Sequence, residues 1–237
     1  MAFLPGLKSR GILPTFFVKV ILLAHTPEPE KVVAAAAKVC YSNSNIKTLY
    51  DKLTPENTAN FIQKLVDMGH ESPMEHVSFT FAIDGVSRSF LAQITRHRIA
   101  SFSVRSQRYC TYESDDFVEP VLKTEKEKEI FNEAVKSAKD YYDKLIEAGA
   151  NKEDARAVLP NAAQTCMMVT MNARELKHFF GLRCCNRAQA EIRTVAKEML
   201  KLVKEVAPNL FKNAGPHCVS LGYCPEGSMG CGQVQKG

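Results

Sequence analysis

Short segments with strand-like patterns alternate irregularly along this chain with helical segments of unequal length. Residues 77–83 (VSFTFAI) alternate apolar and polar side chains, as a half-buried strand does, and residues 18–23 and 165–171 are short apolar runs typical of strands. Residues 99–112 are rich in Ser and Arg and predict a loop leading into a further strand. This irregular order predicts an α+β fold, in which a small, mainly antiparallel sheet is packed with several helices.

Helices are predicted where a capping residue precedes a run of helical apolar periodicity. Thr54 followed by Pro55 is typical of a helix start, and Gly69 is typical of a helix end. The expected helices cover residues 28–39, 54–68, 87–97, 124–148, 151–158, 172–183 and 187–206. The sequence lacks the glycine patterns of a dinucleotide-binding βαβ unit and of a P-loop, so any nucleotide-type ligand would have to be bound in some other way.

Composition is that of a soluble globular protein. Hydrophobic residues make up 45 % of the 237 residues, and no apolar run reaches the roughly 20 residues that span a bilayer. The first residues lack the pattern of a secretory signal, so the cytoplasm is the expected compartment. The net charge of +5 permits an anionic small-molecule ligand but is too weak to argue for nucleic acid.

Eight cysteines without a secretory signal favour reduced thiols over disulfides. Cys40, Cys110 and Cys166 have apolar neighbours in the sequence and are expected to be inert core residues. The Cys/Gly/Pro-rich tail, residues 215–237, holds three Cys and one His, which could complete a tetrahedral zinc shell. Their spacing does not match common zinc sites, so no metal is assigned, and the candidate ligands are His217, Cys218, Cys224 and Cys231.

The densest group of chemistry-bearing residues lies between residues 96 and 108. Arg96, His97 and Arg98 cannot all face a core because buried unpaired charges are costly, so they are expected to face solvent or an anion. An exposed helix end would also carry such a run. Here the run is part of a longer pattern, R-H-R-x-x-S-x-x-x-x-S-x-R. Its fixed positions are Arg96, His97, Arg98, Ser101, Ser106 and Arg108.

This pattern resembles the signature of the flavin-dependent thymidylate synthase family. Further segments similar to that family are 69–76, 156–160, 172–176, 182–183 and 188–193. The resemblance covers roughly residues 15–207, within an expected single catalytic domain at 1–214. The chain has Ser103-Val104 where many members have Asn-Glu, so a carboxylate that would contact ligand is missing.

The resemblance implies reductive methylation of dUMP to dTMP, with FAD as cofactor, 5,10-methylenetetrahydrofolate as one-carbon donor and NADPH as reductant. It implies a homotetramer with active sites shared between subunits, and catalytic roles for Arg183 and His70. A fixed positive charge from Arg183 at the N3/O4 edge of the uracil would stabilise the ionised ring. The alternative interpretations are a cation at a helix C-terminus for Arg183 and a structural histidine for His70.

The resemblance also implies two sets of binding residues, in which arginines suit phosphate because their planar fork makes paired hydrogen bonds. The set for dUMP is Gln93, Ile94, Thr95, Arg96, Arg105, Ser106, Gln107, Arg108, Arg156 and Arg183. The set for FAD is Ser72, Arg96, His97, Arg98, Asn172, Ala173, Arg174 and His178. Arg156 could instead be a capping cation near a helix C-terminus.

Two other functions fit parts of the sequence. A flavin-dependent methylase of another uracil nucleotide, UMP, is compatible with the missing carboxylate at Val104. An Arg-rich nucleic-acid-binding module with a Cys-rich tail is the second alternative, although no ladder of aromatic residues accompanies the arginines.

Overall fold

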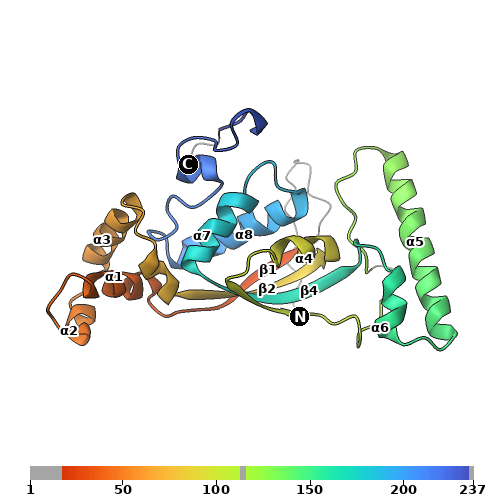
Figure 1. The fold of residues 1–237 in the computed structure, drawn as a ribbon, viewed down its shortest axis with the longest axis horizontal. Coiled ribbons are helices and arrows are strands. Elements are labelled where there is room, and N and C mark those ends of the chain that lie inside the picture. The colour runs from red at the N-terminus through yellow and green to blue at the C-terminus, as the bar shows by residue number, and fades with distance from the viewer. Residues whose placement is uncertain (1–17, 113–115, 235–237) are drawn as a thin grey trace, which may run out of the picture.

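A four-stranded antiparallel sheet forms the centre of the computed structural model, which describes residues 18–112 and 116–234 (Figure 1). The strands are β1 (Lys19–His25), β2 (Ser78–Ser87), β3 (Ala100–Val104) and β4 (Gln164–Asn172), in the spatial order β1-β2-β4-β3. Every neighbouring pair is antiparallel. The α+β class and the antiparallel sheet predicted from the sequence are confirmed.

Residues 99–112 were predicted to be a loop that leads into a strand. The prediction was wrong about where the strand lies, because β3 occupies the start of this segment. Ala100 pairs with Met171 and Val104 with Met167 of β4. Side chains along β3 alternate between half-buried (Ala100, Val104) and exposed (Ser103), which is the period of a strand. The exposed serines and the arginines that follow made this alternation look like loop composition. Further along, the described residues add only an isolated bridge from Phe117 to Ala163.

The helices follow the predicted order, with two short helices added, one after the first predicted helix and one in the C-terminal tail. They are α1 (Pro29–Val39), α2 (Ile46–Asp51), α3 (Pro55–Asp67), α4 (Arg88–Ile94), α5 (Glu125–Glu147), α6 (Lys152–Ala155), α7 (Ala173–Arg183), α8 (Ala190–Val206) and α9 (His217–Ser220). Short 3-10 turns are η1 (Ser72–His76), η2 (Arg156–Val158) and η3 (Gly227–Met229). The unpredicted α2 starts at Asn45, whose side chain accepts a hydrogen bond from the Thr48 amide at 2.8 Å.

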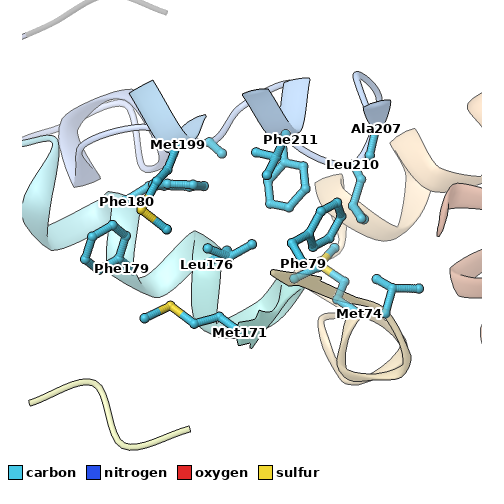
Figure 2. Close-up of a cluster of buried hydrophobic side chains, with 14 of the residues drawn as sticks. Met74, Phe79, Met171, Leu176, Phe179, Phe180, Met199, Ala207, Leu210 and Phe211 are labelled. Atoms are coloured by element: carbon cyan, nitrogen blue, oxygen red, sulfur yellow. The ribbon is translucent and has the colours of Figure 1, made fainter. Parts of the chain in front are cut away.

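One face of the sheet carries the core. Figure 1 shows α7 and α8 lying over this face, and Phe79 of β2 and Met171 of β4 point into it (Figure 2). The Phe211 ring meets Phe79 edge to face, with centroids 5.4 Å apart, and Phe180 meets Phe211 at 6.1 Å. Full burial of one such side chain contributes about 1.5–3 kcal/mol, so this cluster fixes α7 on the sheet.

The opposite face of the sheet is only partly covered by the described residues. Ile21, Ala82 and Met168 pair across three strands in one row on this face. Ile21 is 37 % exposed and Met168 is 47 % exposed. In the next row the hydroxyls of Thr80 and Thr170 are 2.9 Å apart. This face therefore combines small and apolar side chains that lack cover within the described part of the chain.

Two helical groups flank the sheet, with α1–α3 at one end and α5–α6 at the other (Figure 1). Tyr142 is the single buried residue among the 23 residues of α5, and Ile130, Tyr141 and Leu145 on the same helix are exposed. No described helix combines the length and the apolar composition needed to cross a membrane.

The cysteines are free thiols, as predicted, but the three that were expected in the core do not lie there. Cys40 is exposed, Cys110 and Cys166 are half-buried, and the buried thiol near the sheet is that of Cys184. Burial raises the Cys184 pKa to about 12, so this thiol is protonated and inert. Apolar neighbours in the sequence did not identify core cysteines because Cys40 follows the last turn of α1, on the surface.

Candidate active site

The guanidinium of Arg183 is held on two sides at the end of α7. Its Nε donates to Nε2 of His97 at 3.2 Å, and its Nη2 donates to the backbone carbonyl of Gln93 at 3.3 Å. Burial, and then the charge of Arg96, lower the Arg183 pKa from its ordinary value. Three residues that the sequence singled out are thus brought together from α4, from the turn after it and from α7.

His97 is buried, whereas Arg96 and Arg98 on either side of it are exposed. The expectation that the Arg-His-Arg run faces solvent or an anion therefore fits the two arginines and is wrong for the histidine. Helix α4 ends at Ile94, three residues before the predicted end, and the turn that follows places the imidazole under α7. Its ring meets that of Phe179 edge to face at 5.0 Å.

The buried imidazole is neutral. Burial is the largest cause that lowers the His97 pKa, and a hydrogen bond to Glu175 opposes it. His97 Nδ1 lies 2.9 Å from Oε1 of Glu175, while Nε2 faces the Nε–H donor of Arg183. The network therefore places the proton on Nδ1, which donates to Glu175.

Glu175 was missed by the sequence analysis. It stands three residues after Asn172, the N-cap of α7, whose side chain accepts from the Glu175 amide at 2.8 Å. An acid at this position normally signals a helix start. Nothing in the sequence alone indicates that its carboxylate instead turns inward to a histidine 78 residues away in the chain.

A cavity of about 860 Å³ lies beside this network, between α7 and the α3–η1 connection. Of the residues implied for FAD, Asn172, Arg174 and His178 line it. Of the others, Ser72 is exposed at the start of η1, and Ala173 is buried in α7. His70 is half-buried between Gly69 and Glu71, both of which line the cavity.

The donor set of this cavity fits a dinucleotide such as FAD. Its volume is within the range of roughly 300–1,000 Å³ typical of ligand sites. The N-terminal turn of α7 and the cations Arg174 and Lys177 favour an anionic group such as a pyrophosphate. Arg174 is paired with Glu75 and Lys177 with Glu71 (2.6 Å), so an anion would compete with these two carboxylates.

The C-terminal tail lines a second cavity, of about 280 Å³, together with Arg183. Arg187 pairs with Glu226 of the tail at 2.6 Å. The imidazole of His217 lies against Gly181 of α7 and borders both cavities. The tail therefore reaches the candidate site, although the sequence analysis gave it no role there.

The tail does not assemble the zinc ligands considered from the sequence. Within residues 18–112 and 116–234, one group of three potential ligands is close enough to share an ion, namely His97, Glu175 and His178. The tail residues His217, Cys218, Cys224 and Cys231 are not part of such a group. Both ring nitrogens of His97 already have hydrogen-bond partners, Glu175 and Arg183, so His97 has no nitrogen left for a metal ion.

A second set of predicted residues gathers near α6. Arg108 Nε donates to a carboxylate oxygen of Glu153 at 2.6 Å, and Arg156 Nε donates to the Glu153 backbone carbonyl at 3.0 Å. The Ser106 hydroxyl accepts from the Arg108 amide at 3.2 Å. This arrangement of two guanidinium groups and a hydroxyl is suited to phosphate.

Gln107 and Arg105, two further residues predicted to bind dUMP, lie in different surroundings. Gln107 is buried, and its amide donates to the Tyr112 hydroxyl at 3.0 Å, which in turn donates to the Gln164 carbonyl. The Arg105 side chain is exposed at the end of β3, where its backbone amide bonds to Cys166. Gln107 thus has a structural role in addition to the one implied by resemblance.

The residues implied for dUMP form two separate groups in the chain. Gln93, Ile94, Thr95, Arg96 and Arg183 gather at the end of α7, and Arg105 to Arg108 with Arg156 gather near α6. No hydrogen bond or ion pair found among the described residues joins one group to the other.

Comparisons with known proteins agree on one family. Residues 21–209 match the family model of the thymidylate synthase complementing protein. A flavin-dependent thymidylate synthase of Geobacter sulfurreducens is 53 % identical over 223 residues, which cover 92 % of this chain and 96 % of that protein. Another flavin-dependent thymidylate synthase, of Clostridium tetani, is 49 % identical over 240 residues, which cover 94 % of this chain and 96 % of that protein.

A solved structure shows the same fold. It is the structure of a UMP/dUMP methylase from Streptomyces cacaoi bound with 5-Br dUMP. The two structures superpose with a TM-score of 0.72 and 24 % sequence identity, and the match covers 87 % of this chain and 95 % of the methylase chain. The match to the family model and the identities of about one half over nearly the whole length decide the assignment. The chain belongs to the flavin-dependent thymidylate synthase family.

Proposed function

We propose that this protein catalyses the reductive methylation of dUMP to dTMP, with FAD as cofactor, 5,10-methylenetetrahydrofolate as carbon donor and NADPH as reductant. The observation that carries the proposal is the Arg183 guanidinium, fixed by His97 and Gln93 at one end of α7, whose other end borders a cavity with donors that suit a dinucleotide. Family membership supplies the reaction class.

Arg183 has the chemistry that the uracil ring requires. A guanidinium has five N–H donors, and two are used by His97 and Gln93, so three are left for a ligand. A fixed positive charge in a partly buried place stabilises negative charge that develops on N3 and O4 when the ring becomes nucleophilic at C5. When bound, the flavin would supply the hydride that brings the transferred carbon to the methyl level.

Phosphate binding is assigned to Arg108, Arg156 and Ser106. Their separation from Arg183 within the chain supports an active site completed by a second subunit, so that each nucleotide contacts residues of two copies. The partly open sheet face and the exposed apolar stripe of α5 supply surface for a homotetramer. We therefore include self-assembly in the proposed function.

The test is retention of flavin followed by turnover. Protein incubated with FAD and desalted should keep absorption at about 450 nm, bleach with NADPH when dUMP is present, and form dTMP when the folate is added. Parallel assays with UMP decide between the two nucleotides, and preferred methylation of UMP would replace dUMP as the substrate.

Arg183→Ala provides the matched control. It should retain FAD and lose most turnover, because it removes the guanidinium and leaves the cavity at the other end of α7 intact. Wild-type turnover by this variant would remove the role proposed for Arg183. A wild-type protein that retains no flavin, at concentrations where a tetramer persists, would overturn the proposed function.

A further inference from the structure

One buried acid of the candidate site has no part in the reaction as proposed. Glu175 is 7 % exposed and lies in the first turn of α7, where it lines the larger cavity. A buried carboxylate is costly unless an opposite charge and hydrogen bonds compensate it. The partners of Glu175 therefore indicate what the acid contributes.

Those partners lead to Arg183 in two steps. Glu175 Oε1 accepts from His97 Nδ1 at 2.9 Å, and His97 Nε2 accepts from Arg183 Nε at 3.2 Å. The Phe179 ring packs edge to face on the imidazole and limits its rotation. The carboxylate of Glu175 and the guanidinium of Arg183 thus lie on opposite sides of one neutral imidazole ring, and each forms a hydrogen bond with it.

We propose that Glu175 is a positioning residue, which fixes the tautomer and orientation of His97 and thereby holds the Arg183 guanidinium in place for the substrate. The inference rests on the proposed function, in which Arg183 contacts the uracil ring. Neither the sequence motif nor the comparisons with known proteins assign a role to Glu175.

The physical reason is the pairing of donors and acceptors on the ring. A carboxylate at Nδ1 selects the neutral tautomer that carries its proton there, which leaves Nε2 as an acceptor. In the opposite tautomer, an Nε2–H of His97 would face the Nε–H of Arg183, so two donors would oppose each other and the hydrogen bond that holds Arg183 to His97 would be lost. Gln93 alone would then hold the guanidinium.

The direct test is Glu175→Gln, which keeps the size of the side chain and removes the charge. The amide can present its NH2 group to Nδ1 and so stabilise the wrong tautomer. With dUMP as substrate we expect kcat to fall on the order of 10- to 100-fold, because small displacements of a positioned group have effects of this size. KM for dUMP should stay within about two-fold and FAD should be retained, because the loss falls on the transition state.

A double-mutant cycle separates positioning from general damage. If Glu175 acts through Arg183, Glu175→Gln has no further effect on kcat in the Arg183→Ala background. If the fold-losses in kcat of the two single variants multiply in the double variant, the proposal is overturned. Unchanged kcat in the single variant would overturn it too.

Glu30→Gln is the matched structural control. Glu30 accepts hydrogen bonds from the amide and side chain of Asn209 (2.7 and 2.8 Å) and from the amide of Leu210 (3.1 Å). It lines neither cavity of the candidate site. This variant should lose thermal stability with kcat unchanged; if it loses kcat as Glu175→Gln does, the effect at Glu175 is a stability effect and the proposal fails.

A measurement on the wild-type protein needs neither turnover nor a folded variant. With ¹⁵N-labelled histidine, the ring shifts of His97 report which nitrogen carries the proton. A neutral ring protonated at Nδ1 supports the role of Glu175, and a ring protonated at Nε2 overturns it. Absence of dTMP formation in the wild type would contradict the proposed function and would leave this result standing.

Discussion

His97 is a histidine that the fold requires to be neutral. Its pKa is lowered, first by burial, from an ordinary value of 6.5. Below that pH the unfolded chain takes up a proton that the folded protein does not, so the free energy of unfolding falls. We expect stability to be complete above about pH 7 and to decline as the pH drops through the range below 6.5. Urea unfolding at a series of pH values measures this.

His97→Gln is the control for that decline, because glutamine does not titrate. The variant should be less stable at pH 7 than the wild type, since Glu175 and Arg183 lose a shared partner. Its stability should depend less steeply on pH between about 7 and 5. Equal slopes for the two proteins would assign the acid sensitivity to other groups.

Glu153 pairs with Arg108, the residue that we propose binds the phosphate of dUMP. The two side chains form an ion pair at 2.6 Å and are each about half exposed, 54 % for Arg108 and 43 % for Glu153. Glu153→Gln should therefore lower KM for dUMP, because the guanidinium no longer has to leave a carboxylate. An exposed ion pair contributes up to about 1 kcal/mol, so the decrease should not exceed roughly five-fold.

The control is a similar ion pair away from the site. Glu125 and Lys128 on α5 are paired at 2.7 Å, and Glu125→Gln should leave KM unchanged. Steady-state assays over a range of dUMP concentrations compare both variants with the wild type. A higher KM in Glu153→Gln would mean that the carboxylate orients Arg108 for the ligand instead of competing with it.

At the scale of single residues, the sequence singled out Arg183, His97 and Gln93, which meet as a group, but it did not predict the environment of each one. Their roles toward a ligand stay a prediction. The rule that charges face solvent failed for His97 because an imidazole can be neutral and buried, which a guanidinium cannot. Glu175 could not be found because its partner is distant in sequence.

Among the elements, α7 connects the separate parts of the site. Its N-terminal turn holds Glu175 and borders the larger cavity, its middle holds His178, and it ends at Arg183. The close approach of the tail to this helix depends on Gly181. A Cβ built at Gly181 would lie 2.5 Å from the His217 ring, closer than any ordinary contact.

Gly181→Ala should therefore displace His217 and loosen the tail. The substitution would otherwise favour a helix by up to about 1 kcal/mol, so a lower melting temperature would show that the contact dominates. In the His217→Ala background the same change should be neutral or stabilising, because the ring is gone. Thermal unfolding of the four proteins measures the coupling, and equal effects of Gly181→Ala in both backgrounds would show that the tail does not depend on this contact.

Element prediction succeeded where local chemistry decides the structure. Thr54 and Thr124 cap helices as reciprocal capping boxes, and the alternation in 77–83 became β2. It failed for β3, where exposed serines concealed the strand period, and for α2, whose six residues are too few for a periodic signal. Strand order could not be predicted, because β3 pairs with β4 across about 60 residues of intervening chain.

At the scale of the whole molecule, the chain carries two separate groups of the residues that we propose bind the nucleotide, and a partly open sheet. A sheet face with apolar side chains is stable when another layer covers it. The cross-strand partners of Met168 are two small residues, Ala82 and Ser103, so a second copy could approach closely. Assembly on this face would bury Met168 and would bring residues of two copies together.

Met168→Glu should therefore break the assembly, because it would place a charge in a buried interface. Light scattering should give the wild type a mass of four times the 26.4 kDa chain and the variant a smaller mass. Loss of FAD retention and of dTMP formation should accompany the smaller mass, since each site would lack its second subunit. Ile46→Glu, at a residue 64 % exposed on α2 and away from the sheet, should leave mass and activity unchanged. A Met168→Glu protein of wild-type mass would move the interface to another surface, of which the apolar stripe on α5 is the next to test.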